Sequence, residues 1–184
     1  MTNPVQSNPR HVVGAIETEY RRYKSLGEGT IGQLGDEQLL VRPTPESLSL
    51  AMIVWHVSGN LESRFTDFLT TDGEKPWRNR ESEFEERRVS RPELLAKWER
   101  GWKFLFDALE ALTDADLVRV VQVRGVDATV GEALERSLAH TSYHAGQMTF
   151  LGKMLRRDQW KYLSIPPGGT AAYNANPTME KGRR

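Results

Sequence analysis

Three histidines have the residue type and the spacing of a metal site. His140 and His144 are four residues apart in a segment with the apolar pattern of a helix, and His56 lies in a second such segment. Four residues make about one helical turn, so the two imidazoles of the pair point in the same direction. A third imidazole from a facing helix would complete a three-nitrogen site with one open position, the arrangement of catalytic zinc. The alternative is that each histidine is an ordinary core residue whose ring donates to a backbone carbonyl.

Three neutral imidazoles leave the full charge of a divalent ion on the metal. That charge stabilises an anion in the open position, either hydroxide from water or the thiolate of a small thiol. The sequence contains no cysteine, which excludes disulfides, thiolate ligands and a cysteine nucleophile. Any thiol in the reaction must therefore come from outside the chain. Nitrogen ligands suit zinc, nickel, copper and iron alike, and the number of histidines does not separate them. We expect zinc, with nickel, iron or manganese as alternatives.

Composition narrows the class of protein. With 184 residues, of which 38% are hydrophobic, the chain is expected to form one domain over residues 1–184. Lys plus Arg and Asp plus Glu both number 25, and no long basic run is present, so we expect no nucleic-acid partner. No segment resembles a signal peptide or approaches the roughly 20 apolar residues that span a membrane. We therefore expect a cytoplasmic protein without membrane contact.

The apolar pattern predicts an all-α fold, an up-down four-helix bundle. Apolar residues recur with helical spacing in four segments. Ser47 is the predicted N-cap of the second helix, and capping boxes open the third helix at Ser90–Glu93 and the fourth at Thr129–Glu132. The core of such a bundle is a common place for metal sites. The predicted helices span residues 10–31, 47–69, 91–112 and 130–156, followed by a tail over residues 157–184.

The connections between the predicted helices differ in character. A long polar loop joins the second helix to the third. Between the third and the fourth, residues 117–128 are rich in β-branched side chains and contain Gly125, so this insert is either a short hairpin or an irregular crossover. Phe104 and Phe106 fall off the inward stripe of the third helix. They favour a homodimer interface, with burial beneath the loop or the tail as the alternative.

Several longer motifs resemble a known family. The resemblance covers about residues 43–173 and rests on the segments His56–Phe68, Asp72–Arg80, Tyr143–Gln147 and Trp160–Pro166. These motifs are similar to those of the DinB-like superfamily of four-helix metal-binding proteins, and especially of its branch DUF1572. In that superfamily one histidine from the second helix and an H-x-x-x-H pair from the fourth bind a divalent metal. The resemblance implies that His56, His140 and His144 are the ligands.

The resemblance also implies an activity, because relatives in the superfamily include transferases and isomerases that use low-molecular-weight thiols. We expect a metal-dependent transferase that activates a small thiol for attack on an electrophilic small molecule. One alternative is a metal-dependent hydrolase that uses bound water, which needs a carboxylate base such as Glu62 or Asp67. The other is a non-enzymatic, metal-binding stress-response protein in which the metal only holds the bundle together.

Asn60 and Arg64 share a helical face with His56, because each follows at an interval of four residues. Asn60 is a candidate catalytic residue that orients a ligand or contacts substrate, or else a buried amide that satisfies a carbonyl. Arg64 is a candidate to grip a carboxylate. Its alternative role is a structural ion pair with Asp67 or with a carboxylate of the following loop.

Four further residues are candidates near the site. Arg78 and Arg80, in the polar loop, are predicted to anchor an anionic substrate or thiol, unless nearby glutamates such as Glu83 neutralise them. Tyr143 is a candidate to donate a proton or orient a ligand, and Gln147 to bind substrate, because both lie within one turn of the histidine pair. Packing is the alternative role for Tyr143.

Overall fold

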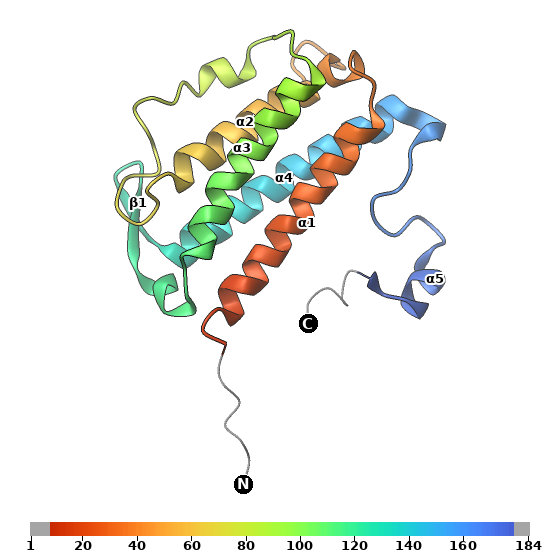
Figure 1. Cartoon of the computed structure of the whole chain (residues 1–184). Helices are drawn as coiled ribbons and strands as arrows, with labels where there is room; N and C mark the ends of the chain where they lie inside the picture. The colour runs from red at the N-terminus through yellow and green to blue at the C-terminus, as the bar shows by residue number, and fades with distance from the viewer. Residues whose placement is uncertain (1–7, 179–184) are drawn as a thin grey trace.

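Four long helices follow the predicted apolar stripes (Figure 1). In the computed structural model, which describes residues 8–178, they are α1 (His11–Gln33), α2 (Leu50–Phe65), α3 (Arg91–Glu110) and α4 (Val130–Arg156). Helix α2 packs against α3, helix α1 packs against α4, and α2 also contacts α4. This mostly helical arrangement is compatible with the predicted all-α bundle. The N-terminal segment, where no signal peptide was recognised, and the last six residues of the predicted tail lie outside the described residues.

Local signals in the sequence explain where the helices begin. The predicted capping boxes are formed: Ser90 and Glu93 bond reciprocally at the start of α3, and Thr129 and Glu132 do the same at α4. The N-cap of α2 is Ser49, whose Oγ accepts a hydrogen bond from the Met52 N–H at 3.2 Å. The prediction of Ser47 as the N-cap is wrong. Ser47 lies two residues earlier, in a turn in which its N–H donates to the Thr44 carbonyl at 3.0 Å.

Helix α2 is also shorter at its end than predicted. It stops at Phe65, and Asp67 takes the left-handed conformation with a φ of 49°, which an α-helix cannot continue through. Phe68 nevertheless lies in the core, with 8% of its surface exposed. The apolar stripe therefore runs on past the helix, which explains the predicted end at residue 69. Helices α1 and α3 differ from prediction by no more than two residues at either end, and α4 agrees.

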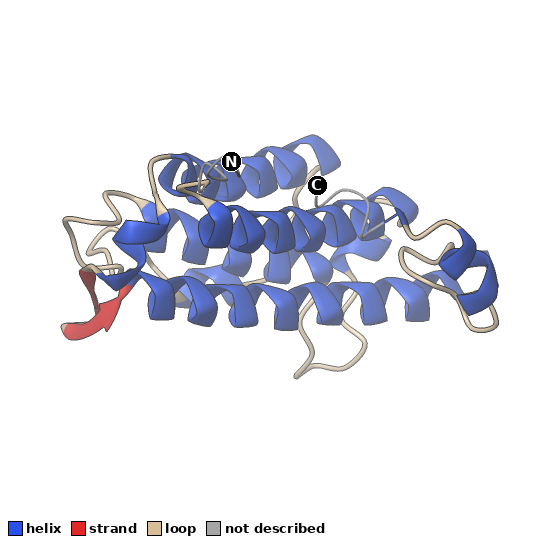
Figure 2. Ribbon diagram, turned by 90° about the horizontal axis from the view of Figure 1, so that it is seen from below, coloured by secondary structure: helices blue, strands red, loops and turns tan. Residues whose placement is uncertain are grey.

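Of the two predictions for the insert before α4, the hairpin is correct. Strands β1 (Val120–Val123) and β2 (Val126–Thr129) pair antiparallel, with Val123 opposite Val126. Figure 2 shows both strands at one end of the long helices. A 3-10 helix, Asp114–Val118, leads into the hairpin from α3.

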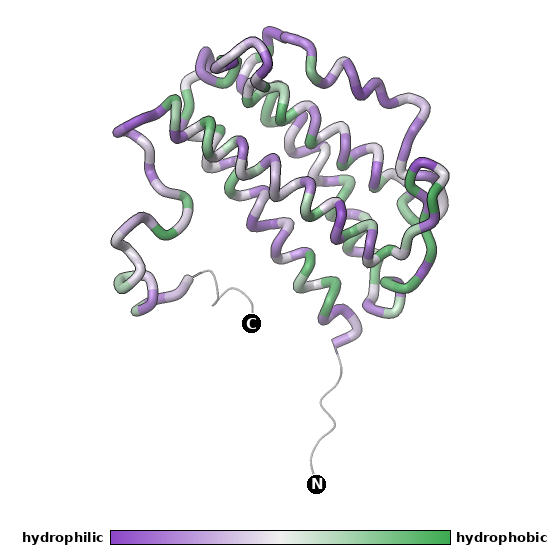
Figure 3. Tube along the Cα trace, turned by 180° about the vertical axis from the view of Figure 1, so that it is seen from behind, coloured by the Kyte–Doolittle hydropathy of each residue, from purple (hydrophilic) through white to green (hydrophobic). Residues whose placement is uncertain are grey.

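The loop between α2 and α3 is hydrophilic along much of its length (Figure 3) and contains a 3-10 helix, Glu81–Phe84, that was not predicted. Its first part is tied to the hairpin. The Asp72 carboxylate accepts hydrogen bonds from the N–H groups of Arg124 and Gly125 at 2.8 and 2.6 Å. The Gly73 N–H donates to the Gln122 carbonyl at 2.9 Å. Two segments far apart in the sequence therefore form one structure at this end of the molecule.

Short elements complete the described chain. A 3-10 helix, Gln38–Leu40, lies between α1 and α2. The tail contains another 3-10 helix, Arg157–Gln159, and a short helix α5 (Thr170–Ala175). Figure 1 shows α5 on the side away from the hairpin. The sequence predicted neither element of the tail. Within residues 8–178 no helix combines the length and the apolar character needed to cross a membrane.

Aromatic side chains of α3 contribute much of the core. Trp98 and Trp102 are fully buried and meet edge to face, with ring centroids 5.3 Å apart. Phe106 stacks on Trp102 and carries the Arg21 guanidinium over its outer face, while Arg100 lies over Phe104. The two phenylalanines are thus half-buried under arginines of the same molecule. The homodimer remains a prediction.

Tyr20 links α1 to α4 through a hydrogen bond in the core, and its contribution can be measured. The side chain is fully buried, and its hydroxyl donates to the Leu134 carbonyl at 2.9 Å. We expect Tyr20→Phe to lower the free energy of unfolding by about 1–2 kcal/mol, because the hydroxyl and its bond are lost from a site that excludes water. Urea denaturation at constant m-value measures this change.

Tyr23→Phe is the matched control, because Tyr23 is half-buried on the same helix and its hydroxyl has no hydrogen-bond partner among the described residues. We expect this variant to unfold at nearly the wild-type urea concentration. Equal destabilisation by both variants would show that the hydrogen bond to Leu134 contributes nothing.

Candidate metal centre

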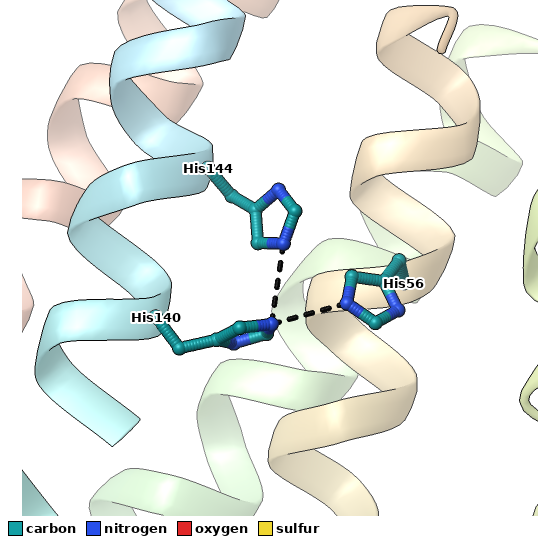
Figure 4. A group of neighbouring side chains, drawn as sticks. All are labelled: His56, His140 and His144. Carbon is teal, nitrogen blue, oxygen red and sulfur yellow. Dashed lines mark hydrogen bonds between the residues drawn. The ribbon is translucent and has the colours of Figure 1, made fainter. Parts of the chain in front are cut away.

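The three predicted ligands meet between α2 and α4 (Figure 4). The His140 Nε2 atom lies 3.1 Å from Nε2 of His56 and 3.2 Å from Nε2 of His144. His56 and His144 are buried, and His140 is half-buried. Nitrogens that are each about 2.0–2.1 Å from a tetrahedral zinc ion are themselves a little over 3 Å apart. The two distances from His140 match this spacing, and all three atoms lie within 4.8 Å of one another.

In two of the rings, the hydrogen bond of the outer nitrogen, Nδ1, determines the tautomer and so whether the inner nitrogen, Nε2, carries a proton in the neutral form. His56 donates from Nδ1 to the Glu83 carboxylate at 2.9 Å, and His144 donates from Nδ1 to Oε1 of Gln147 at 2.7 Å. With the proton on Nδ1, the neutral form of either ring has its lone pair on Nε2, which lies 3.1 Å (His56) or 3.2 Å (His144) from Nε2 of His140. Polar partners on the outer nitrogen are the usual means of setting the tautomer of a metal-binding histidine.

The three Nε2 atoms show whether the site fits a metal, because hydrogen bonds among them cannot satisfy every lone pair. A single proton on His140 Nε2 could bond to only one of the two facing lone pairs well, and the other would remain unsatisfied. A cation at the point of convergence satisfies all three lone pairs. The residues present therefore fit a divalent metal, and the triad could hold one.

The surroundings keep the histidine pair neutral. Burial, together with the nearby charges of His144 and His56, lowers the pKa of His140 to about 3. Burial and the charge of His56 lower the pKa of His144 to about 4, against the opposing effect of its bond to Gln147. Both rings are therefore deprotonated near neutral pH, which is the form that binds a metal.

Glu83 holds His56 and is itself held by Arg78. Burial alone would raise the pKa of Glu83, but the hydrogen bonds from His56 and Arg78 outweigh it and lower the pKa, so the group is a carboxylate. Arg78 forms a bidentate pair with it, with Nε and Nη2 at 2.8 and 2.9 Å. Gly59 makes room for this carboxylate, because a Cβ at residue 59 would collide with Glu83 Oε1.

A cavity of about 540 Å³ opens beside the triad. Helices α2 and α4, the loop after α2 and the hairpin all contribute to its wall. His56 and His140 line it, and Asn60 and Arg64 follow His56 along the same face of α2. A small molecule in this cavity would lie directly against two of the three histidines.

The structure brings four of the six predicted neighbours of the triad to this cavity. Asn60, Arg64, Arg78 and Arg80 all line it. Arg64 forms no ion pair with Asp67 or with a loop carboxylate in the described part of the chain. Arg78 and Arg80 pair with Glu83 and Glu81, respectively, as in the neutralised alternative, while remaining on the cavity wall.

Tyr143 and Gln147 lie on the other side of His144. Gln147 bonds to the ring of His144, and its amide nitrogen donates to the Tyr143 hydroxyl at 3.1 Å. Tyr143 is 63% exposed, with its ring 5.1 Å from that of His144 between centroids. Neither residue lines the cavity, so their contacts favour support of His144 over contact with a molecule there.

Three residues at the site escaped prediction. Glu83 was considered only as a neutralising charge, because nothing in the sequence shows that the 3-10 helix places it against His56. Arg124 reaches the cavity from the hairpin turn, and its position depends on the tertiary contact with Asp72. Arg136 had a usable signal: with His140 and His144 it forms an i, i+4, i+8 series on one face of α4.

The fold and the site together define a helical protein with a three-histidine centre able to hold a divalent metal. The chain belongs to the family described as protein of unknown function (DUF1572), whose sequence model matches residues 8–169. None of the curated proteins compared with the chain gives a significant match.

The contact between Glu83 and His56 predicts an effect on metal affinity. We expect Glu83→Gln to weaken binding of zinc by about 10- to 100-fold while leaving one ion bound per chain at saturation, because the ring is less well held and less basic without the carboxylate. Competition with a chromophoric chelator measures the dissociation constant.

Glu81→Gln serves as the control, because Glu81 is exposed two residues away and contacts Arg80 but no histidine. Its affinity should equal that of the wild type. An unchanged affinity in Glu83→Gln would mean that the carboxylate does not support the site.

The lowered pKa values of His140 and His144 predict how stability depends on pH in the metal-free protein. The folded protein keeps both rings neutral, whereas the unfolded chain binds protons below about pH 6.5. The free energy of unfolding should therefore fall as the pH falls, by about 1–2 kcal/mol in total at pH 5.5 after allowance for solvent screening at His140.

Denaturation of the metal-free wild type and of His140→Gln/His144→Gln between pH 7 and pH 5.5 tests this expectation. The double variant should lose less stability over that range. Parallel pH profiles for the two proteins would contradict the assignment of the effect to this pair.

Proposed function

We propose that the protein is a divalent-metal-dependent transferase that activates a low-molecular-weight thiol for attack on an electrophilic small molecule. We also propose that it is an up-down four-helix bundle of the DinB-like superfamily and that zinc is its metal. The observation that carries the proposal is the convergence of three imidazole nitrogens beside an open cavity that two of the histidines line. The absence of cysteine from the sequence means that the thiol is a second molecule.

Each part of the site has a task in this reaction. His56, His140 and His144 would hold the ion, and Glu83 and Gln147 fix the orientation of two of the rings. When bound, the ion would lower the pKa of a thiol and favour its thiolate form. The cavity brings both reactants to the side of His56 and His140. The thiol loses its proton to solvent, its sulfur forms a bond to an electrophilic carbon, and the leaving group departs with the electrons of the broken bond.

The carboxylates near the site argue against the hydrolase alternative. Activation of water usually needs a carboxylate base within hydrogen-bond reach, and none of the residues that line the cavity is acidic. Glu62 faces α3, where it accepts hydrogen bonds from Lys97 and Arg100. Glu83 already bonds to both His56 and Arg78. Attack by a thiolate needs no such base, so this arrangement supports thiol transfer.

The cavity also argues against a metal that only holds the bundle together. Structural metal sites are usually closed by four protein ligands. In the described part of the chain, the group that could hold a metal consists of three histidines and no fourth ligand. A reactant in the cavity could therefore reach the remaining position.

Metal content and access to the site can be tested together. We expect near-stoichiometric metal in the wild type and in His11→Ala, and almost none in His140→Ala, because of the two substituted histidines only His140 belongs to the triad. His11 is the matched control, being exposed at the start of α1. Elemental mass spectrometry after dialysis without chelator gives the content. Cobalt-substituted wild type should then show a sulfur-to-metal charge-transfer band when a small thiol is added.

Two results would overturn the proposal. Absence of metal from the wild type even after supplementation would exclude a metal-dependent reaction at this site. Bound cobalt whose spectrum does not respond to any small thiol would favour the non-enzymatic alternative, in which the ion is inaccessible.

A further inference from the structure

The cavity beside the histidines is strongly cationic. No acidic side chain lines it, whereas five arginines do, drawn from helices α2 and α4, from the loop after α2 and from the hairpin. Arginine presents a planar set of N–H donors that matches the oxygens of a carboxylate or a phosphate. The five residues are Arg64, Arg78, Arg80, Arg124 and Arg136.

Three of these arginines are paired and two are not. Arg78 pairs with Glu83, Arg80 with Glu81, and Arg124 with Glu74. Arg64 and Arg136 form no ion pair within the described chain. Asp72 and Glu74 act on Arg64 through space, but the hydrogen bonds of Asp72 go to backbone N–H groups of the loop and the hairpin. Two positive charges of the cavity are therefore not matched by a bonded carboxylate.

Two buried N–H groups on the cavity wall also lack acceptors. Arg64 Nη1 and Arg78 Nη1 are both shielded from solvent and have no hydrogen-bond partner among the described residues. Only 2% of the Arg78 side chain is exposed. Buried donors without partners cost stability, and that cost would be removed if either side chain shifted to bond an acceptor bound in the cavity.

The position of Arg64 is built into the loop. Gly73 packs against it: a Cβ at residue 73 would lie 2.9 Å from Arg64 Nη1 and 3.0 Å from its Cδ. The Gly73 backbone is fixed in turn by its hydrogen bond to the Gln122 carbonyl. The guanidinium is thus held beside the backbone of a segment that is itself tied to the hairpin.

The positive charges near Arg64 oppose its own charge. Burial lowers the pKa of the Arg64 guanidinium, and the positive charges of Arg124, Arg78 and Arg136 lower it further, against the attraction of Glu74. Like charges gathered at a half-buried site destabilise the empty protein. An anion in the cavity would offset that repulsion.

From these observations we propose that the cavity binds a small oxyanion, a carboxylate or a phosphate, through Arg64 and Arg136. As a substrate site this rests on the proposed function, and it makes one reactant, the thiol or the electrophile, a small acid. The anionic group would lie at the arginines and the reacting atom beside His56 and His140. Asn60, which lines the same face of α2 and has no side-chain hydrogen bond in the described chain, is available to a polar group between them.

Calorimetric titration of the metal-free protein tests the proposal. The probes are succinate, inorganic phosphate and succinamide, the uncharged analogue of succinate, at constant ionic strength. Chelators are anions, so they are removed before the titration. We expect at least one of the two anions to bind at least tenfold more tightly than succinamide. Whichever anion binds identifies the preferred oxyanion.

The variants Arg64→Gln and Arg136→Gln should each weaken binding of that anion by tenfold or more. Arg119→Gln is the control, because Arg119 is half-exposed and pairs with Asp116 outside the cavity. It should bind within twofold of wild type. Arg136 is exposed, so its variant is expected to fold even if Arg64→Gln does not, and thermal unfolding of each variant checks this.

Equal binding of succinamide and succinate without binding of phosphate, or no binding of either anion, would overturn the proposal. So would anion binding that is unchanged in both cavity variants. Because the titration uses metal-free protein, its result is independent of the proposed transferase. A wild type that binds the anion but no metal would refute the function and leave the anion site, whereas the reverse result would refute only the anion site.

Discussion

The arrangement of the site depends on three imidazole Nε2 atoms that lie together and that, in the neutral rings, have too few protons to form hydrogen bonds with one another. In their neutral forms His56 and His144 each have a lone pair on Nε2, beside Nε2 of His140, because their outer nitrogens donate to Glu83 and Gln147. Protonation of the rings would relieve the shortage in water, but burial makes that unfavourable for His140 and His144. A divalent cation would satisfy all three atoms in their neutral form. The packing of α2 against α4 thus serves both the core and the three histidines, since it sets the distance between His56 and the pair on α4.

The long helices and the histidine pair of α4 could be predicted from the sequence because both depend on local rules. Capping boxes and apolar stripes at a spacing of 3.6 residues located α3 and α4, and the pair His140 and His144 required only that α4 be helical. The placement of His56 opposite that pair rested on the resemblance to a metal-binding superfamily, since spacing within α2 carries no information about its neighbours. The end of α2 was misjudged because Phe68 extends the apolar pattern from a position outside the helix.

The surroundings of the triad were harder to predict, because they depend on contacts between segments distant in the sequence. Glu83 reaches His56 through a 3-10 helix in a loop whose composition is simply polar, and Arg124 reaches the cavity because Asp72 binds the hairpin turn. The helical face that Arg64 shares with His56 marked it as a candidate site residue, and an ion pair with Asp67 or a loop carboxylate was the alternative. Arg64 forms no such pair among the described residues. The absence of such a bond, which leaves a buried nitrogen of the Arg64 guanidinium without a partner among the described residues, could not be foreseen.

The bonds that join the loop after α2 to the hairpin also affect how the family can diversify. They involve Asp72, Gly73, Gln122, Arg124 and Gly125, and none of these contributes a ligand to the triad or an apolar side chain to the core. One wall of the cavity is therefore separable from the elements that stabilise the fold and hold the three histidines. A relative that kept the four long helices but changed these two surface segments would retain the same reactive centre and admit a different molecule to it. In such a family, the three histidines and the shape of the cavity beside them can evolve independently.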